Sequence, residues 1–308
     1  MTVNVYACGG AGTNIAKQIK NLDINTFYID TSLSNLRGVL EQHTFVMDDI
    51  DGAGKDRSKT YNHIKANRIE DKILIKFKPS NSMNVVLHSL SGGSGSIIAP
   101  FIVKKLLEDN KNVIVVCVDS RTSVKEIDNS IKTLMTYKSI SDQTKSTVPL
   151  FFIHNKNRKE ADAQAIAFIH LVDILLDKTK TEEFDVTDFT NFLQFQVVSD
   201  NQPTVGIIEV SKNEEVIPSK GSHIASSIIV TKTKDFQVYP AIADHLSNCI
   251  VTDPSYDQED IRIDHIVGAY VNIIKSLENQ LQEINNQKRM SDISDIEVQA
   301  NTSDGIVL

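Results

Sequence analysis

The sequence has few glycines, prolines and cysteines for a chain of 308 residues. Its 13 glycines and 7 prolines are too few for a collagen-like or low-complexity protein. Its three cysteines, Cys8, Cys117 and Cys249, lie among apolar residues and form no CxxC motif. Free thiols in such surroundings behave as small buried hydrophobes, and an odd number cannot all pair. We therefore expect a folded chain that works in a reducing compartment, the cytoplasm.

Long apolar runs and a basic leader are also missing. No uncharged apolar stretch reaches the roughly 18 residues that a membrane-spanning helix requires. Residues 1–6 carry no basic group ahead of a long apolar stretch, as a secretory signal would. We therefore expect neither secretion nor insertion into a membrane.

Positive charge is in deficit, because 32 Lys and Arg residues face 40 Asp and Glu residues. The formal net charge is -8 at pH 7, and the pI is about 5.5. A protein that binds nucleic acid usually presents a basic surface to the phosphates, so direct DNA binding is not expected. The histidines are scattered without an HxxxH or HExxH motif, which disfavours a zinc site. The absence of GxSxG disfavours a serine hydrolase.

Short apolar runs alternate with helical patterns through the first half of the chain. This alternation is typical of βαβ units around a mostly parallel, doubly wound sheet, which binds ligands beyond the carboxyl ends of its strands. Strands are predicted at residues 3–8, 26–29, 44–47, 84–90, 113–118 and 148–153. Helices are predicted at residues 14–20, 59–71, 97–109 and 124–137.

The pattern changes at residue 159. Residues 159–178 are apolar on nearly every side of a helix, which predicts a core helix buried between two layers. Apolar residues three or four apart from Ile263 to Ile284 predict a long C-terminal helix, and the acidic segment after Met290 has little helical signal. β-rich runs between these parts favour a smaller second sheet, at residues 195–198, 205–210, 226–232 and 248–252.

The chain is therefore expected to be an α/β protein of two domains, since 308 residues exceed the usual size of one core. A doubly wound, mostly parallel first domain precedes the buried core helix and a smaller second α/β domain. A long C-terminal helix and an acidic tail follow. The expected bounds of these parts are residues 1–158, 159–178, 179–256, 257–290 and 291–308.

Two glycine-rich loops follow predicted strands and precede predicted helices. They are Gly9-Gly10-Ala11-Gly12-Thr13-Asn14 and Ser91-Gly92-Gly93-Ser94-Gly95-Ser96. Where side chains are missing, backbone N–H groups can close around an anion at the N-terminus of a helix. The serine hydroxyls can bond phosphate oxygens or cap the helix. One such loop can be an empty tight turn, but two in one parallel sheet favour a phosphorylated nucleotide.

Other motifs narrow the choice of nucleotide. The absence of GxxxxGK[ST] excludes a Walker A loop. Gly10-Ala11-Gly12, with Asp30 at the end of the second predicted strand, suits a NAD-dependent oxidoreductase with a Rossmann-type domain. Ile15 stands where that fold needs a small residue, so this enzyme is the alternative hypothesis. A scaffold that has the fold but ignores nucleotides is a second alternative.

The two loops resemble the nucleotide loops of the tubulin/FtsZ superfamily, most closely those of its phage and plasmid members of the PhuZ/TubZ kind. Residues 91–96 are similar to the signature GGGTG[ST]G, with Ser91, Ser94 and Ile97 replacing a glycine, the threonine and the last glycine. The resemblance implies a GTPase that uses GTP, GDP and Mg²⁺ and polymerises head to tail into dynamic filaments. It also implies a GTP-binding first domain, an activation domain after the core helix, and the positioning of phage or plasmid DNA in a bacterial cytoplasm.

The same resemblance implies roles for individual residues. A third loop is expected to sense the terminal phosphate through Gly52, Ala53, Gly54 and Lys55. The ribose is expected near Asp119 and Glu126, and the base near Asn155 and Asp162. From the residues alone, Lys55 also suits an exposed turn, and Asp119 or Glu126 an N-cap or a solvated helix acid. The nucleotide is further expected at Gly10, Ala11, Gly12, Asn14, Gly92, Gly93, Ser94, Gly95 and Ser96.

Asp185 and Asp188 are the catalytic residues that the resemblance implies. In the superfamily a Dxx[DE] loop at this place completes the active site of the next subunit, and the spacing here matches. Carboxylates with ordinary pKa values near 3.9 are ionised at neutral pH, so they can orient an attacking water and help hold a cation. Without the resemblance, an N-cap of a helix at residues 189–195 is the better interpretation of Asp188.

The acidic tail places apolar residues between its carboxylates, namely Ile293, Ile296, Val298, Ile306 and Leu308. Composition alone favours an unstructured, solubilising end. The resemblance implies instead that the tail docks on a basic groove of another subunit. The expected partner is therefore a second copy of the chain, with no direct contact to nucleic acid or membrane.

Overall fold

The computed structural model describes residues 2–20, 23–47, 57–177, 185–212, 218–231, 248–252 and 261–302. Its strands are β1 (Val3–Cys8), β2 (Ile24–Asp30), β3 (Thr44–Val46), β4 (Met83–Ser89), β5 (Val113–Asp119), β6 (Val148–His154), β7 (Val205–Lys212), β8 (His223–Thr231), β9 (Asn248–Thr252) and β10 (Ile261–Val267). They form a ten-stranded sheet in the order β3-β2-β1-β4-β5-β6-β7-β10-β8-β9. Every pairing from β3 to β7 is parallel, whereas β10 is antiparallel to β7 and β8. The predicted α/β class with a mostly parallel sheet is confirmed.

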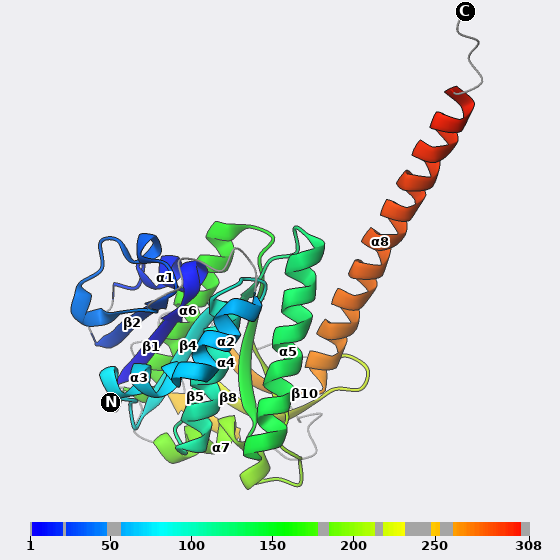
Figure 1. Ribbon diagram of the computed structural model, residues 1–308. Coiled ribbons are helices and arrows are strands. Elements are labelled where there is room, and N and C mark those ends of the chain that lie inside the picture. Colours follow the sequence, from blue (N-terminus) through cyan, green and yellow to red (C-terminus); the bar gives the residue numbers. More distant parts are fainter. Residues whose placement is uncertain are drawn as a thin grey trace, which may run out of the picture.

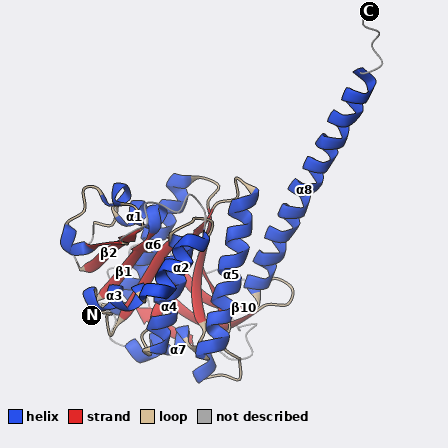
Figure 2. Cartoon of the chain, in the orientation of Figure 1, coloured by secondary structure: helices blue, strands red, loops and turns tan. Residues whose placement is uncertain are grey.

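Helices cover both faces of this sheet (Figure 1, Figure 2). They are α1 (Gly9–Ala16), α2 (Arg57–Asn67), α3 (Ile69–Lys76), α4 (Gly95–Glu108), α5 (Val124–Thr144), α6 (Arg158–Leu176), α7 (Val186–Leu193) and α8 (Ala269–Thr302). One core lies under α2, α3, α4, α5 and α8, and the other lies under α1, α6 and α7. Strands between two helical layers are apolar on both sides, as β5 shows with all its residues buried. None of the helices in the described ranges is long and apolar enough to cross a membrane.

The first half of the chain follows the prediction closely. All six predicted strands are present with nearly the predicted ends. The predicted helix at residues 59–71 is instead two helices, α2 and α3. Arg68 separates them because its φ of 47° lies in the left-handed region, which an α-helix cannot continue through.

The second half departs from the prediction of a separate, smaller sheet. β7 pairs with β6 from Val148↔Val205 to Phe151↔Ile208, so the later strands extend the first sheet. The predicted strand at residues 195–198 is a 3₁₀ turn, η3 (Phe195–Val197). The prediction that the core helix is buried on nearly all sides is wrong, because α6 buries its sheet-facing side and leaves Ala163 and Ala167 exposed. Alanine counts as apolar in the sequence pattern, so the pattern did not reveal that Ala163 and Ala167 lie on an exposed face.

The C-terminal helix also has different bounds from those predicted. Ile263 and Ile266 belong to β10, and α8 starts only at Ala269, after the positive φ of Gly268. The helix then continues to Thr302, through much of the segment interpreted as a tail, since no glycine or proline interrupts it there. α8 first packs beside α5 and then projects away from the body (Figure 1).

Candidate functional site

The two glycine-rich loops meet backbone to backbone at the carboxyl ends of β1 and β4. A Cβ added to Gly9, whose φ is +73°, would lie 2.6 Å from Gly95 N, and a Cβ on Gly95 would lie 2.4 Å from Cys8 O. A Cβ on Gly12 would lie 2.3 Å from Leu87 O, where α1 rests on β4. The helix predicted from residue 14 begins earlier, because these glycines form the first turns of α1. Only glycine permits such close approach of two backbones.

Unpaired backbone donors gather in this place. α1 and α4 start after Cys8 and Ser94, and neither of these N-cap side chains bonds to its helix. Within the described residues, the backbone N–H groups from Gly92 to Ser96 have no acceptor. Free N–H groups at helix N-termini, together with the helix dipole, attract anions. The predicted loops therefore form a cradle that fits a phosphate group.

The serine hydroxyls of the second loop bond within the protein. Ser96 Oγ donates to Gly92 O at 2.5 Å, which links the two ends of the glycine segment. Ser94 Oγ shares a hydrogen bond of 2.7 Å with Thr31 Oγ1. The loop after β2 thus belongs to the cradle, and sequence reasoning missed Thr31. The available signal was its position just beyond the carboxyl end of a predicted strand, where ligands of this fold class bind.

Asn35 is a second residue that the sequence did not single out. Its side-chain nitrogen lies 3.0 Å from the position of a Cβ on Gly10 and donates to Asp30 Oδ2 at 2.7 Å. Thr31 N donates to the other oxygen of Asp30, also at 2.7 Å. Burial raises the pKa of this carboxyl group. The dinucleotide alternative needs Asp30 to receive a ribose, whereas here both of its oxygens hold the β2 loop.

The two acids implied at the ribose are buried. Asp119 accepts from Ser130 Oγ at 2.5 Å and from Arg121 Nε at 2.6 Å, and it has no exposed surface. Glu126 accepts from Thr122 N at 2.9 Å and from the Thr122 hydroxyl. Both carboxylates shape the turn between β5 and α5, and their contact with a sugar stays a prediction.

The residues implied at the base come from two neighbouring parts of the same edge. Asn155 follows β6, and its backbone N donates to Asp119 O at 2.9 Å. Gln18 Nε2 lies 3.2 Å from Asp162 Oδ2 on α6 and 3.1 Å from Asn14 O on α1. Asn14 and Asp162 are therefore neighbours, as a shared ligand requires.

The predicted third loop, with Gly52, Ala53, Gly54 and Lys55, lies outside the described residues.

Asp185 and Asp188 form a capping box at the start of α7. Asp185 Oδ1 accepts from Thr187 N at 2.6 Å and from Asp188 N at 3.0 Å, and Asp188 Oδ2 accepts from Asp185 N at 3.1 Å. The N-cap is thus Asp185 and not Asp188, and the helix begins at Val186 rather than at residue 189. The mutual bonds hold both carboxylates in one fixed place.

This acidic pair lies at the opposite edge of the sheet from the cradle. Thr190 of α7 bonds with Asn112, which directly precedes β5, at 2.9 Å. Six steps of about 3.3 Å separate the first and last of the seven residues of β5, so the strand spans about 20 Å, and the cradle lies at the far end of that length. Figure 1 shows α7 at the bottom of the molecule and α1 near the top. Asp185 and Asp188 therefore do not reach the phosphate cradle of their own chain.

A parallel sheet with two glycine loops at its carboxyl edge defines a nucleotide-binding class of α/β protein. No protein-family profile matches the chain. A phage tubulin-like protein of Pseudomonas phage PhiPA3 is 30% identical over 226 residues, which cover 72% of this chain and 70% of that protein. The chain belongs to the phage tubulin-like proteins of the tubulin/FtsZ superfamily.

Solved structures agree in fold. A protofilament of TubZ from bacteriophage PhiKZ superposes with a TM-score of 0.82 at 24% identity, covering 93% of this chain and 92% of that one. The phage tubulin PhuZ with GDP gives a TM-score of 0.82 at 20% identity and covers 94% and 92% of the two chains. The resemblance predicted from the sequence is confirmed, and the oxidoreductase alternative is not supported. Among the described residues, no group of His, Cys, Asp or Glu side chains suits a metal ion.

Proposed function

We propose that this chain is a GTPase that polymerises head to tail and hydrolyses GTP at the junction between subunits. The opposite placement of the phosphate cradle and the Asp185–Asp188 pair is the observation that carries the proposal. Each half of the site is preformed, but the two halves lie about 20 Å apart in one chain. Stacking one subunit on the next brings the acidic edge of one chain to the cradle of another.

The cradle is assigned to the phosphates of GTP. The N–H groups of residues 92–96 and the start of α1 would hold the phosphate oxygens, with Asn14, Asn155 and Asp162 towards the base. The relative PhuZ, whose structure contains GDP, supports a guanine nucleotide, and a carboxylate suits the N1 and N2 donors of guanine. Bound Mg²⁺ would neutralise charge on the phosphates during transfer to water.

The catalytic step is assigned to the neighbour's Asp185 and Asp188. Both are surface groups held in place by the capping box, so they meet the nucleotide without rearrangement of α7. A carboxylate placed there can orient the attacking water and help to hold the cation. Hydrolysis then requires assembly, and loss of the terminal phosphate weakens the junction.

The deciding measurement is turnover per subunit as a function of protein concentration. We expect turnover to rise steeply at the concentration where light scattering first reports polymer. A slowly hydrolysed GTP analogue should give stable polymer without phosphate release. Turnover per subunit that is independent of protein concentration would contradict a shared site. Light scattering that is the same with and without GTP would favour the scaffold alternative.

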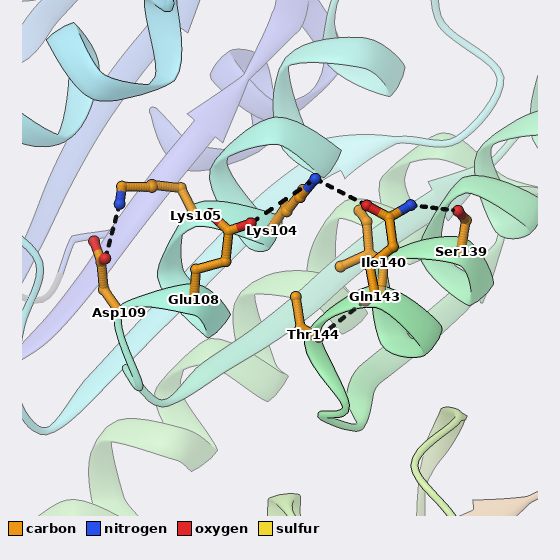
Figure 3. Close-up of polar contacts among 8 residues, drawn as sticks. All are labelled: Lys104, Lys105, Glu108, Asp109, Ser139, Ile140, Gln143 and Thr144. Atoms are coloured by element: carbon orange, nitrogen blue, oxygen red, sulfur yellow. Dashed lines mark hydrogen bonds and ion pairs between the residues drawn. The ribbon is translucent and has the colours of Figure 1, made fainter.

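The C-terminal segment 291–308 is proposed to dock on a second copy. A groove of about 550 Å³ between α2, α4 and α5 is a suitable surface. Phe101 and Met135 give it an apolar wall, and Lys104 and Lys132 add positive charge. Lys104 reaches Glu108 at 3.8 Å and Gln143 at 2.9 Å (Figure 3). Exposed pairs of this kind contribute at most about 1 kcal/mol, so an incoming carboxylate can replace them.

Removal of this segment tests the docking. A chain that ends at Met290 should polymerise only at a higher concentration than the full chain, as measured by pelleting. A full-length control with Asp292, Asp295 and Glu297 changed to the matching amides separates charge from length. Equal assembly of all three chains would contradict docking. The filaments are proposed to position phage DNA in the host bacterial cytoplasm, without direct contact between the subunit and DNA or membrane.

A further inference from the structure

Arg57, the first residue of α2, lies against the second glycine-rich loop. Its Nη2 donates to Ser96 O at 3.4 Å, and its Nη1 donates to Asn129 O on α5 at 3.0 Å. Burial lowers the pKa of this guanidinium, which reflects the cost of removing a charge from water. The two carbonyl acceptors compensate part of that cost and fix the side chain between α4 and α5.

The other end of the loop is held from α5. Asn129 Nδ2 donates to Ser91 O at 3.1 Å, and Thr133 Oγ1, one turn later, donates to Leu90 O at 3.0 Å. Arg57 and Asn129 therefore grip the last and first carbonyls of the segment 91–96. They are also joined to each other, because Arg57 bonds to the backbone of Asn129.

Between these two fixed carbonyls lie the N–H groups of Gly92 to Ser96, which have no acceptor among the described residues. A hydrogen bond weakens steeply when its donor turns away from the acceptor. Glycines impose little conformational preference of their own, so the direction of these donors depends on the bonds that hold the loop. The Ser96 and Ser94 hydroxyls hold its middle, and Arg57 and Asn129 hold its two ends.

We propose that Arg57 is a positioning residue for phosphate recognition, which together with Asn129 clamps both ends of the loop 91–96. The inference rests on the proposed binding of GTP. Arg57 acts through the loop and not by touching the nucleotide. A planar guanidinium suits this task because it presents two donors at fixed angles, whereas a lysine presents a single flexible ammonium group.

The test is a measurement of GTP and GDP affinity on dilute, unassembled protein. Arg57→Ala and Asn129→Ala should each weaken both nucleotides by about tenfold, since each loses a buried bond that orients the loop. The double variant should be little weaker than either single one, because both changes release the same loop. Arg57→Lys should recover only part of the loss.

Lys125→Ala is the matched control, because Lys125 is an exposed cation on α5 and its loss changes the net charge equally. It should bind both nucleotides like the unchanged protein. Thermal unfolding of each variant separates general destabilisation from loop release. Affinity of Arg57→Ala equal to that of the control, or fully multiplicative losses in the double variant, would overturn the assignment. Failure of the unchanged protein to bind GTP would instead contradict the proposed function itself.

Discussion

Asn112 and Thr190 are joined by a side-chain hydrogen bond. Asn112 Nδ2 donates to Thr190 Oγ1 at 2.9 Å, and the Thr190 hydroxyl in turn donates to Val186 O at 2.7 Å. The pair joins α7 to the amino end of β5, in the centre of the sheet. The acidic residues at the start of α7 are therefore tied to a fully buried central strand, at the edge where a second subunit would stack in the proposed filament.

Replacement of Asp188 by Asn should separate catalysis from binding. The amide oxygen can still accept from Asp185 N, so α7 keeps its cap, but the negative charge is lost. We expect GTP affinity to stay unchanged and hydrolysis to slow by about 10²–10⁴-fold, with longer-lived polymer. Phosphate release and sedimentation measure the two effects, and normal turnover would show that Asp188 has no catalytic role.

Mixing two inactive variants provides a sharper test of the shared site. Asp188→Asn keeps an intact cradle, and Gly95→Ala keeps an intact acidic edge. In a mixture, junctions between the cradle of one chain and the acids of the other are complete. We expect the mixture to hydrolyse GTP faster than either variant alone. A mixture no faster than the average of its parts would place both functions in one chain.

Gly95→Ala alone should open the contact between the two loops. The new methyl group would lie 2.4 Å from Cys8 O and 3.1 Å from Cys8 C, which are backbone atoms and cannot move aside like the end of a flexible side chain. We expect nucleotide affinity to fall at least tenfold and the melting temperature to drop. Gly92→Ala is the matched comparison for stability, because its nearest neighbour would be Ser89 Cβ at 3.8 Å, an ordinary contact, and its melting temperature should stay the same.

Gly206→Ala should destabilise the fold without involving the nucleotide. A Cβ at this position would lie 2.0 Å from His265 Nε2, and His265 is fixed by a bond of 2.9 Å from Nδ1 to Phe192 O. Overpacking of this kind costs about 1–3 kcal/mol in the free energy of unfolding. The double variant with His265→Ala should be more stable than the sum of the single changes predicts, since it removes the clash. Chemical denaturation measures all three, and strict additivity would contradict the explanation.

Two buried histidines should make stability depend on pH. Burial lowers the pKa values of His88 and His265 from 6.5 to about 4. Between these pH values the two histidines bind protons in the unfolded chain but stay neutral in the folded chain. The free energy of unfolding should therefore decrease as pH falls from about 6.5 towards 4. His88→Gln should give a shallower decrease between pH 7 and 5. Asp30 and Asp264, whose pKa values are raised by burial, act in the opposite direction and cancel in this comparison.

Parallel pH curves for the two proteins would show that the pKa of His88 is the same in the folded and unfolded chains, so that burial does not lower it. The substitution tests one group, because the glutamine amide can still accept from Tyr137 OH, which lies 2.7 Å from His88 Nε2. Lower stability at pH 7 alone is expected and does not bear on the slope.

The first half of the fold was predictable because two signals agree there. Strands such as residues 113–118 are apolar on both faces, and the two glycine-rich loops mark where β1 and β4 end. The secondary structure of residues 263–266 was not predictable from periodicity, since two isoleucines three apart also suit a helix. These residues form a strand because they pair with β7 and β8, which lie far away in the sequence.

The sequence predicted the parts of the candidate site that glycine-rich loops form. It did not predict the parts that depend on contacts between residues far apart in the chain. Gly9 and Gly95 are visible as loop residues, but their mutual approach is visible only in three dimensions. Thr31, Asn35 and Arg57 carry no motif, because an ordinary polar side chain acquires its role from the residue that it meets.

In the proposed filament, the separation of cradle and acids along β5 would give a stack of subunits two chemically different tips. At one tip the outermost chain would show an uncovered nucleotide that no neighbour could hydrolyse, so the newest layer there would retain its triphosphate longest. At the other tip the outermost chain shows only carboxylates. A protein that covered the α7 face would arrest elongation at that tip and leave its opposite free to grow.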